Sequence, residues 1–406
     1  MACRVELRGG GTGRAVVPAG ASTGGHEARE RRDGGARYRG YGVQSAVDAV
    51  NTVYGPLLAG RSAEDRAAID ATMEVEDGRP DLGRLGANAA LAVSLAVTLA
   101  GADGRGEPLW RVLDPAGGPP LLPMPMVNIV SGGAHAGRAV DIQDVLAVPV
   151  GAASFRQALE WASAVRHQAA VLLEQAGGWS ALVADEGGLA ARLDSNDAAL
   201  SLVARAIDAA GFQPYDDVGI AIDVAANQLM DGDEIVLAGQ RERLDPAAWI
   251  ERVTGWTRQY PIISIEDVLA EDDWAGWCAA TSRLAGIQVI GDDLFATDLD
   301  RLTRGIDQGA ANAVLVKVNQ AGTVSRAERV LGYAQRAGIA TVVSARSGDS
   351  EDSWLADFAV GWRAGQIKVG STMRSERTAK WNRLLEIESE GATRFAGRSA
   401  LRAALP

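Results

Sequence analysis

Six charged residues stand at or close to the ends of short apolar runs in the second half of the chain, 22 to 43 residues apart. Three acids come first and three bases follow: Asp223, Glu266, Asp292, Lys317, Arg346 and Lys368. Most of these intervals equal one strand plus one helix, so the residues are predicted to follow successive strands. A single charge at a strand end usually just meets solvent. Six in succession predict one shared site, because the carboxyl ends of all strands in a closed barrel meet at one mouth.

The grouping of these charges indicates the chemistry of the site. Three neighbouring carboxylates repel one another unless a cation lies between them, and oxygen-only ligands favour Mg²⁺. The three acids are therefore predicted metal ligands, and the three bases are predicted to hold an anionic substrate. A metal facing a basic wall suits removal of a proton next to a carboxylate. Lys317 is the predicted base, and we expect burial and neighbouring cations to lower its pKa.

The elements that would position this site fall into two parts. Residues 1–113 are predicted to form a small α+β domain, with two short strands around a glycine-rich hairpin and a buried apolar helix near residues 86–101. The Gly/Pro-rich segment Asp114–Pro125 is the expected linker. Residues 114–406 alternate β-branched runs with amphipathic helical stretches, which indicates parallel strands with helical crossovers and favours a (β/α)8 barrel.

The composition excludes several other classes of protein. Of the 406 residues, 47% are hydrophobic and 23% are charged, so the chain can bury a large core. A net charge of −12 argues against nucleic-acid binding, which needs clustered positive charge. Cys3 and Cys278 lack the spacing of a disulfide framework or a zinc site. Without an uninterrupted membrane-length apolar run or a signal-peptide pattern, the protein is expected to be cytoplasmic.

Ten motifs, in order along the chain, resemble those of the enolase family. They are GASTGGHEA, LGANAALAVSLAV, PMPMVNIVSGGAHAG, ADEGGLA, IDVAAN, YPIISIEDVLAEDDW, GDDLFATD, NAVLVKVNQAGT, SARSGDSED and AGQIKVGSTMRSERTAKWN. The resemblance implies a small α+β domain that caps a modified (β/α)8 barrel. It also implies a carbon–oxygen lyase that removes water from a 2-phosphoglycerate-like substrate, with two Mg²⁺ ions per site. Because the family has a further strand before the first motif, we expect the small sheet to lack an edge strand.

The family's functional residues carry over position by position. The resemblance implies that Lys317 takes the α-proton and that Glu186 helps hydroxide to leave. The implied metal ligands are Asp223, Glu266 and Asp292, with Ser22 for a second ion. The implied substrate-binding residues are His135, Gln143, Asp144, Arg346, Ser347 and Lys368. The expected partners are a small phosphorylated or phosphonylated anion and further copies of the chain in a homodimer or higher homo-oligomer, with no nucleic acid and no membrane.

Four positions depart from the family pattern. Ala345 stands where the family has His, Asp144 where it has Glu, Ser131 where it has Asn, and Val268 where it has Pro. The ring missing at Ala345 frees volume beside Arg346, and one ring or methylene can retune specificity. This favours a specialised paralogue whose substrate carries a carboxyl group on phosphorus, as in phosphinothricin-type antibiotic biosynthesis. The alternatives are glycolytic enolase, which makes phosphoenolpyruvate, and a catalytically inactive enolase-like binding protein.

Overall fold

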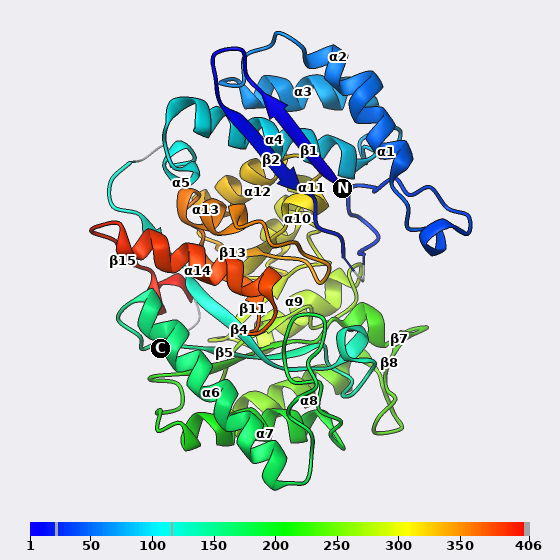
Figure 1. Ribbon diagram of the computed structural model, residues 1–406. Helices are drawn as coiled ribbons and strands as arrows, with labels where there is room; N and C mark the ends of the chain where they lie inside the picture. Colours follow the sequence, from blue (N-terminus) through cyan, green and yellow to red (C-terminus); the bar gives the residue numbers. More distant parts are fainter. Residues whose placement is uncertain (21–22, 115–116, 402–406) are drawn as a thin grey trace.

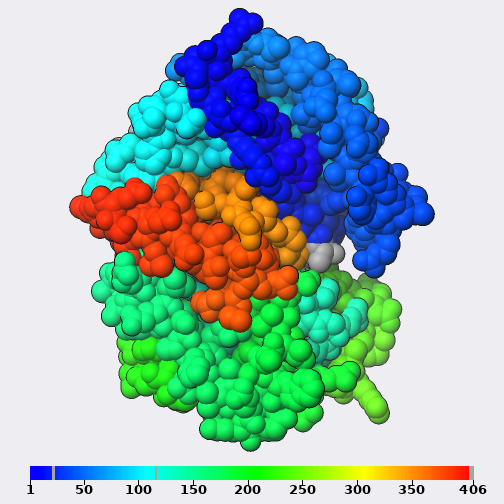
Figure 2. All heavy atoms as spheres, in the orientation of Figure 1, coloured from blue at the N-terminus to red at the C-terminus, as the bar shows by residue number. Residues whose placement is uncertain are grey.

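The protein has two parts, a small N-terminal domain and an eight-stranded barrel surrounded by helices (Figure 1). This computed structural model describes residues 1–20, 23–114 and 117–401. The small domain, blue to cyan in the figures, lies across one end of the barrel and forms the upper part of the molecule in Figure 2. The predicted fold class, an α/β protein with a modified barrel and a small α+β domain, is confirmed.

The small domain begins with an antiparallel hairpin that packs on helices. Strands β1 (Ala2–Glu6) and β2 (Thr12–Val16) form a two-stranded sheet among the described residues, as expected. The helices that follow are η1 (Arg37–Gly40), α1 (Gln44–Ala49), η2 (Val50–Tyr54), α2 (Gly55–Leu58), α3 (Arg66–Asp77), α4 (Ala87–Arg105) and α5 (Leu109–Val112).

Helix α4 is the core of the small domain. Its residues 87–98 are all buried, because it packs between the hairpin, α3 and the helices of the barrel. Among the described residues, α4 alone has the length and apolarity of a membrane span, with a mean hydropathy of 1.3. Because 78% of that apolar stretch lies inside the protein, its composition is that of a core helix.

The barrel strands close in chain order, with the last strand paired to the first. They are β4 (Met124–Ser131), β5 (Asp144–Val148), β6 (Gly219–Asp223), β10 (Ile262–Glu266), β11 (Gln288–Gly291), β12 (Ala313–Val316), β13 (Ala340–Ser344) and β14 (Gly365–Gly370). The surrounding helices are α6 (Phe155–Gln175), α7 (Asn196–Ala209), α8 (Pro246–Gln259), α9 (Trp274–Arg283), α10 (Leu299–Gln308), α12 (Val324–Arg336), α13 (Trp354–Gly361) and α14 (Ser375–Ser389).

Shorter elements lie at the ends of the barrel and on its surface. Strand β3 (Leu121–Leu122) pairs with β15 (Arg394–Phe395), and β7 (Met230–Asp231), β8 (Glu234–Leu237) and β9 (Glu242–Leu244) form a separate sheet. The short helices are η3 (Gly133–Ala136), η4 (Ala226–Leu229), α11 (Val318–Ala321) and η5 (Gly397–Leu401). The predicted linker, Asp114–Pro125, is partly wrong, because it includes β3 and the first residues of β4.

Strand β5 corrects the expectation of an all-parallel barrel. It runs antiparallel to both β4 and β6, whereas the other neighbouring pairs are parallel. The connection from β4 to β5, residues 132–143, contains a single short 3-10 helix, so no crossover helix returns the chain to the starting end. The first residue of β5 therefore lies at the same mouth as the last residues of its neighbours.

The barrel is filled by apolar side chains from alternate strand positions. One buried cluster lies inside it and includes Met124, Leu146, Ile263 and Leu315. A second and larger cluster lies between the strands and the helices and continues into the small domain through α4. The charged residues at the strand ends are thus held by a rigid, closely packed apolar core.

The contact between the hairpin and α4 gives a stability prediction. A Cβ atom added to Gly13 would lie 1.9 Å from the Ala96 carbonyl oxygen and 2.4 Å from the Ala100 nitrogen, both backbone atoms. We expect Gly13→Ala to lower the free energy of unfolding by about 3 kcal/mol in urea denaturation, because the hairpin must shift away from the helix. Gly9→Ala is the control, since a Cβ there meets no atom within 4 Å. Equal losses in the two variants would contradict the close packing.

Candidate active site

The predicted strand-end residues do converge. Asp223 and Glu266 are the last residues of β6 and β10 and are paired with each other in register. Asp292 and Lys317 follow β11 and β12 by one residue, Arg346 follows β13 by two, and Lys368 lies within β14. Five of the six line one pocket, and Glu266 lies directly behind Lys368. The shared site predicted from spacing is therefore present.

The acids and bases are interleaved rather than separated. Lys368 Nζ donates to Asp223 Oδ2 and to Glu266 Oε1, both at 2.7 Å, and all three side chains are almost completely buried. Lys317 Nζ pairs with Asp292 Oδ2. The strands that carry the acids and those that carry the bases form two adjacent groups, as predicted, but the side chains of the two groups meet at the mouth. Each lysine neutralises the acids beside it, because buried charges need partners.

This pairing also corrects the expected pKa of Lys317. Burial is the largest single effect and would lower the pKa, but the carboxylates around the ammonium, first Asp292 and then Glu266, together raise the pKa above its usual value. The expectation relied on neighbouring cations, whereas the nearest charge to the ammonium is an acid. For the acid Glu266, burial has the opposite effect and raises the pKa, and the charge of Asp223 adds to this rise.

The donor set fits a magnesium ion. Asp223 Oδ1 and Glu266 Oε2 are buried oxygens with no hydrogen-bond partner among the described residues. Orphaned buried carboxylate oxygens are costly, and a hard divalent cation satisfies them. Asp292 lies at the same mouth and would complete a set of three oxygen ligands. Ser22, the predicted ligand of a second ion, lies outside the described residues.

Asp267, which was not predicted from the sequence, positions one of these ligands. Its Oδ1 accepts the backbone N–H of Asp292 at 2.9 Å and its Oδ2 accepts that of Asp293 at 3.0 Å. Its backbone has a φ of 46°, which is uncommon for a residue with a side chain and aims the carboxylate at the next strand. The signal in the sequence was the acidic pair at the end of β10, of which only the first member was singled out.

Gln143, His135 and Glu186 reach the pocket from the side of β5. Gln143 Nε2 donates to Asp223 Oδ2 at 2.8 Å, and its Oε1 accepts from Gln228 Nε2 at 2.7 Å. His135 and Glu186 also line the pocket. Burial alone would lower the pKa of His135, but carboxylates, first of all that of Asp144, raise it to about 9. His135 therefore carries positive charge at neutral pH.

Asp144, predicted to bind substrate, lies behind the pocket. It is fully buried and is absent from the residues that line the pocket in the described part of the chain. Its Oδ1 accepts from Asn128 Nδ2 and, at 3.0 Å, from Ser131 Oγ, while its Oδ2 lies 3.7 Å from His135 Nδ1. The Asp144 side chain therefore lies behind His135 and does not reach the surface of the pocket. Two of the departures from the family pattern, at positions 131 and 144, thus contact each other.

The glycines beside Glu186 hold this acid in place. Gly187 has a φ of 82°, and a Cβ there would lie 2.5 Å from the Met373 carbonyl oxygen. A glycine is therefore required for the turn that carries Glu186 to the pocket. The backbone oxygen of Glu186 also accepts the N–H of Ser371 at 2.8 Å, which fixes the loop to the segment after β14.

Arg346 forms an ion pair that was not predicted from the sequence. Its guanidinium forms a two-pronged ion pair with Glu27, with Nη1–Oε2 at 2.8 Å and Nη2–Oε1 at 3.2 Å. Glu27 comes from the small domain and lines the pocket together with Arg346, Ser347 and Ala345. The carbonyl oxygens of Arg346 and Ser347 accept hydrogen bonds from the guanidinium of Arg377, which fixes the backbone of this segment. Glu27 and Arg346 are 319 residues apart, and no local pattern signals their contact.

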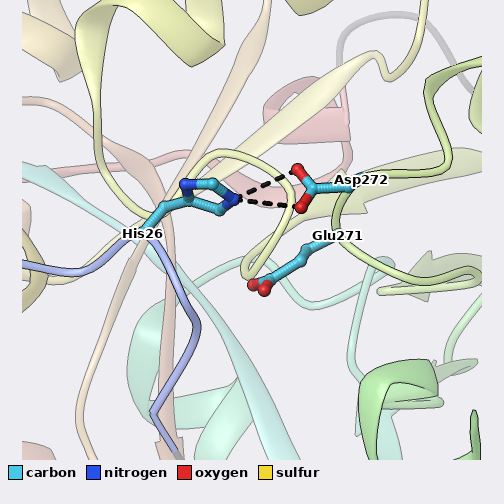
Figure 3. Close-up of side chains that lie close together, drawn as sticks. All are labelled: His26, Glu271 and Asp272. Atoms are coloured by element: carbon cyan, nitrogen blue, oxygen red, sulfur yellow. Dashed lines mark hydrogen bonds and ion pairs between the residues drawn. The ribbon is translucent and has the colours of Figure 1, made fainter.

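The segment around Glu27 is fastened to the barrel on both sides. The N–H of Gly25 donates to both oxygens of Glu271, and His26 Nε2 lies 3.1 Å from Asp272 Oδ1 (Figure 3). The N–H of Ala28 donates to the Gln320 carbonyl oxygen at 2.8 Å. Residues 25–28 of the small domain therefore form part of the wall of the barrel mouth.

Comparison with protein-family models covers both parts of the chain. Residues 1–113 match the model described as the enolase N-terminal domain. Residues 120–404 match the model described as the enolase C-terminal TIM barrel domain.

The orphaned carboxylate oxygens predict Mg²⁺-dependent stability. Mg²⁺ at one hundred times its dissociation constant should stabilise the protein by about 2.7 kcal/mol, seen as a rise in the thermal unfolding midpoint. Glu266→Gln should reduce this Mg²⁺-dependent rise, because it removes a charged ligand. Asp272→Asn is the control, since this exposed acid lies in the separate cluster of Figure 3 and should leave the rise intact. The opposite pattern would assign the metal to that cluster.

Proposed function

Because the chain belongs to the enolase family, we propose that it is a magnesium-dependent dehydratase that converts a 2-phosphoglycerate-like substrate into an enolpyruvate ester. The proposal is carried by the convergence of acids, lysines and Arg346 on one pocket at the barrel mouth. We further propose that the substrate is a carboxyphosphono analogue, so that the reaction resembles that of carboxyphosphonoenolpyruvate synthase in phosphinothricin-type antibiotic pathways. Ala345, in the pocket wall beside Arg346, supports this choice.

In this proposal Lys317 and Glu186 divide the two proton transfers. Lys317 must first lose the proton that its ion pair with Asp292 stabilises. As the neutral amine it then takes the proton from the carbon next to the substrate carboxylate, and the electron pair of that bond moves into the carboxylate. When the pair returns to form the carbon–carbon double bond, the hydroxyl on the next carbon leaves, and Glu186 gives it a proton so that it departs as water. Mg²⁺ bound at Asp223, Glu266 and Asp292 would stabilise the intermediate dianion and would compete with Lys317 for Asp292.

The remaining pocket residues orient the substrate. Lys368 would contact the substrate carboxylate, and Arg346 with Ser347 would hold the group on phosphorus, for which a guanidinium fork is suited. The positive charge of His135 would lie on the same side as Glu186. Ala345 occupies less space than the ring that the family has there, which leaves room for the extra carboxyl group of a carboxyphosphono substrate.

Glycolytic enolase remains the second candidate, because the predicted base, acid and metal ligands are equally those needed for 2-phosphoglycerate. Wild-type protein is assayed with 2-phosphoglycerate and with the phosphonoformate ester of glycerate, following enolpyruvate formation by ultraviolet absorbance. Turnover of the ester with little turnover of 2-phosphoglycerate supports the carboxyphosphono assignment. Turnover of 2-phosphoglycerate alone identifies glycolytic enolase, and inactivity on both supports an enolase-like binding protein.

Ala345→His tests the origin of this specificity. The restored ring should lower kcat/KM for the ester relative to that for 2-phosphoglycerate by about tenfold or more. The control is Val268→Pro, which restores another family residue at a fully buried position outside the residues described as lining the pocket. That variant should leave the ratio unchanged. A constant ratio in both variants would mean that Ala345 does not select the substrate.

Isotope exchange tests the assignment of Lys317 as the base and Glu186 as the acid. Lys317→Ala should lower elimination by at least about 100-fold and should also abolish exchange of the α-proton with deuterated water, because both need the base. Glu186→Gln should lower elimination similarly but retain α-proton exchange, since proton removal precedes its step. Exchange that persists in Lys317→Ala would show that another group is the base.

A further inference from the structure

The three bases of the pocket differ in the acids that neutralise them. Lys368 is paired with Asp223 and Glu266, and Lys317 with Asp292, which are all proposed metal ligands. Arg346 is paired with Glu27, which is not a proposed metal ligand. Metal binding would therefore draw the carboxylates away from both lysines, and the two ammonium groups would then be available to the substrate. It would leave the ion pair of Arg346 in place.

The pair between Glu27 and Arg346 is built as a strong interaction. The side chains are only 8% and 4% exposed, and the two contacts follow the parallel geometry in which a guanidinium binds an oxyanion. Glu27 Oε1 also accepts the N–H of Gly24 at 2.9 Å, so the carboxylate is held in this position. A carboxylate of the protein thus occupies the fork that an anionic substrate needs.

We propose that Glu27 is a specificity-determining residue that competes with the substrate's phosphorus-bearing anion for Arg346. The inference rests on the proposed function for the role of Arg346. Phosphate, phosphonate and carboxyphosphonate groups all present two oxygens to the guanidinium of Arg346 and can replace the Glu27 carboxylate. An anion that makes only one hydrogen bond to the guanidinium, or that binds it more weakly than Glu27, cannot. The pocket thereby rejects anions that do not make both contacts.

Displacement of Glu27 does not require its segment to leave the barrel. Gly25, His26 and Ala28 are each fastened by contacts that do not involve Arg346. Rotation of the Glu27 side chain therefore breaks both of its contacts with the guanidinium, and the backbone on either side stays in the wall of the pocket. Competition for Arg346 is then set by the charge and length of one side chain.

The experiment measures binding of inorganic phosphate and of phosphonoformate to Mg²⁺-saturated protein by isothermal titration calorimetry. Glu27→Gln removes the charge but keeps an oxygen for the Gly24 N–H, and it should bind both probes about tenfold more tightly than wild type. Glu27→Asp shortens the side chain and should also bind more tightly, by a smaller factor. It is the second variant if Glu27→Gln does not fold.

Two further variants control the result. Glu271→Gln alters the carboxylate that holds Gly25 without touching Arg346, and it should keep wild-type affinity within about twofold. Arg346→Gln should lose probe binding in the presence or absence of Glu27. Unchanged or weaker binding in Glu27→Gln would overturn the proposal, as would a gain of equal size in Glu271→Gln or full binding in Arg346→Gln.

These outcomes are separate from those that test the proposed function. Probe binding needs no turnover, so a protein inactive on both substrates can still show competition by Glu27. Conversely, a protein that dehydrates either substrate while Glu27→Gln binds the probes no more tightly would retain the proposed function and lose only this inference.

Discussion

Charge compensation at the barrel mouth is the constraint on which the rest of the site depends. Asp223, Glu266 and Asp292 are buried side by side, and burial of a carboxylate is unfavourable unless a cation or hydrogen bond offsets it. Lys368 and Lys317 supply that offset in the protein itself. Two carboxylate oxygens, Asp223 Oδ1 and Glu266 Oε2, have no hydrogen-bond partner among the described residues, so the offset is incomplete, and this is the basis for proposing that the cluster binds a divalent cation.

The geometry that holds these charges comes from two departures from a regular barrel. Reversal of β5 brings its first residue into register with Asp223, so that Gln143 hydrogen-bonds a proposed metal ligand. The small domain contributes Glu27 to the same pocket from a segment fastened at Gly25 and Ala28. The site is therefore complete only when the small domain is docked on the barrel.

The sequence allowed the fold class and the strand-end residues to be predicted, because apolar runs with one charge at the end recur at the spacing of a strand and a helix. Contacts between distant segments could not be predicted in this way. The pairing of Glu27 with Arg346 and the pKa of Lys317 depend on which side chains meet across the mouth. The direction of β5 depends on a connection whose length is compatible with either orientation. Asp144 aligns with a Glu of the family, but the sequence could not show whether its shorter side chain extends to the pocket, because that depends on its hydrogen bonds with Asn128 and Ser131.

The contact between Ser131 and Asp144 has a consequence for how this sequence could have evolved. Ser131 Oγ donates to Asp144 Oδ1 in a fully buried position, so each residue forms part of the environment of the other. A longer carboxylate at 144 would meet the serine and Asn128 in a closely packed space, and a larger amide at 131 would compete for the same oxygen. We therefore expect substitutions at positions 131 and 144 to have non-additive effects on stability, so that a change at one position is better tolerated when the other changes with it.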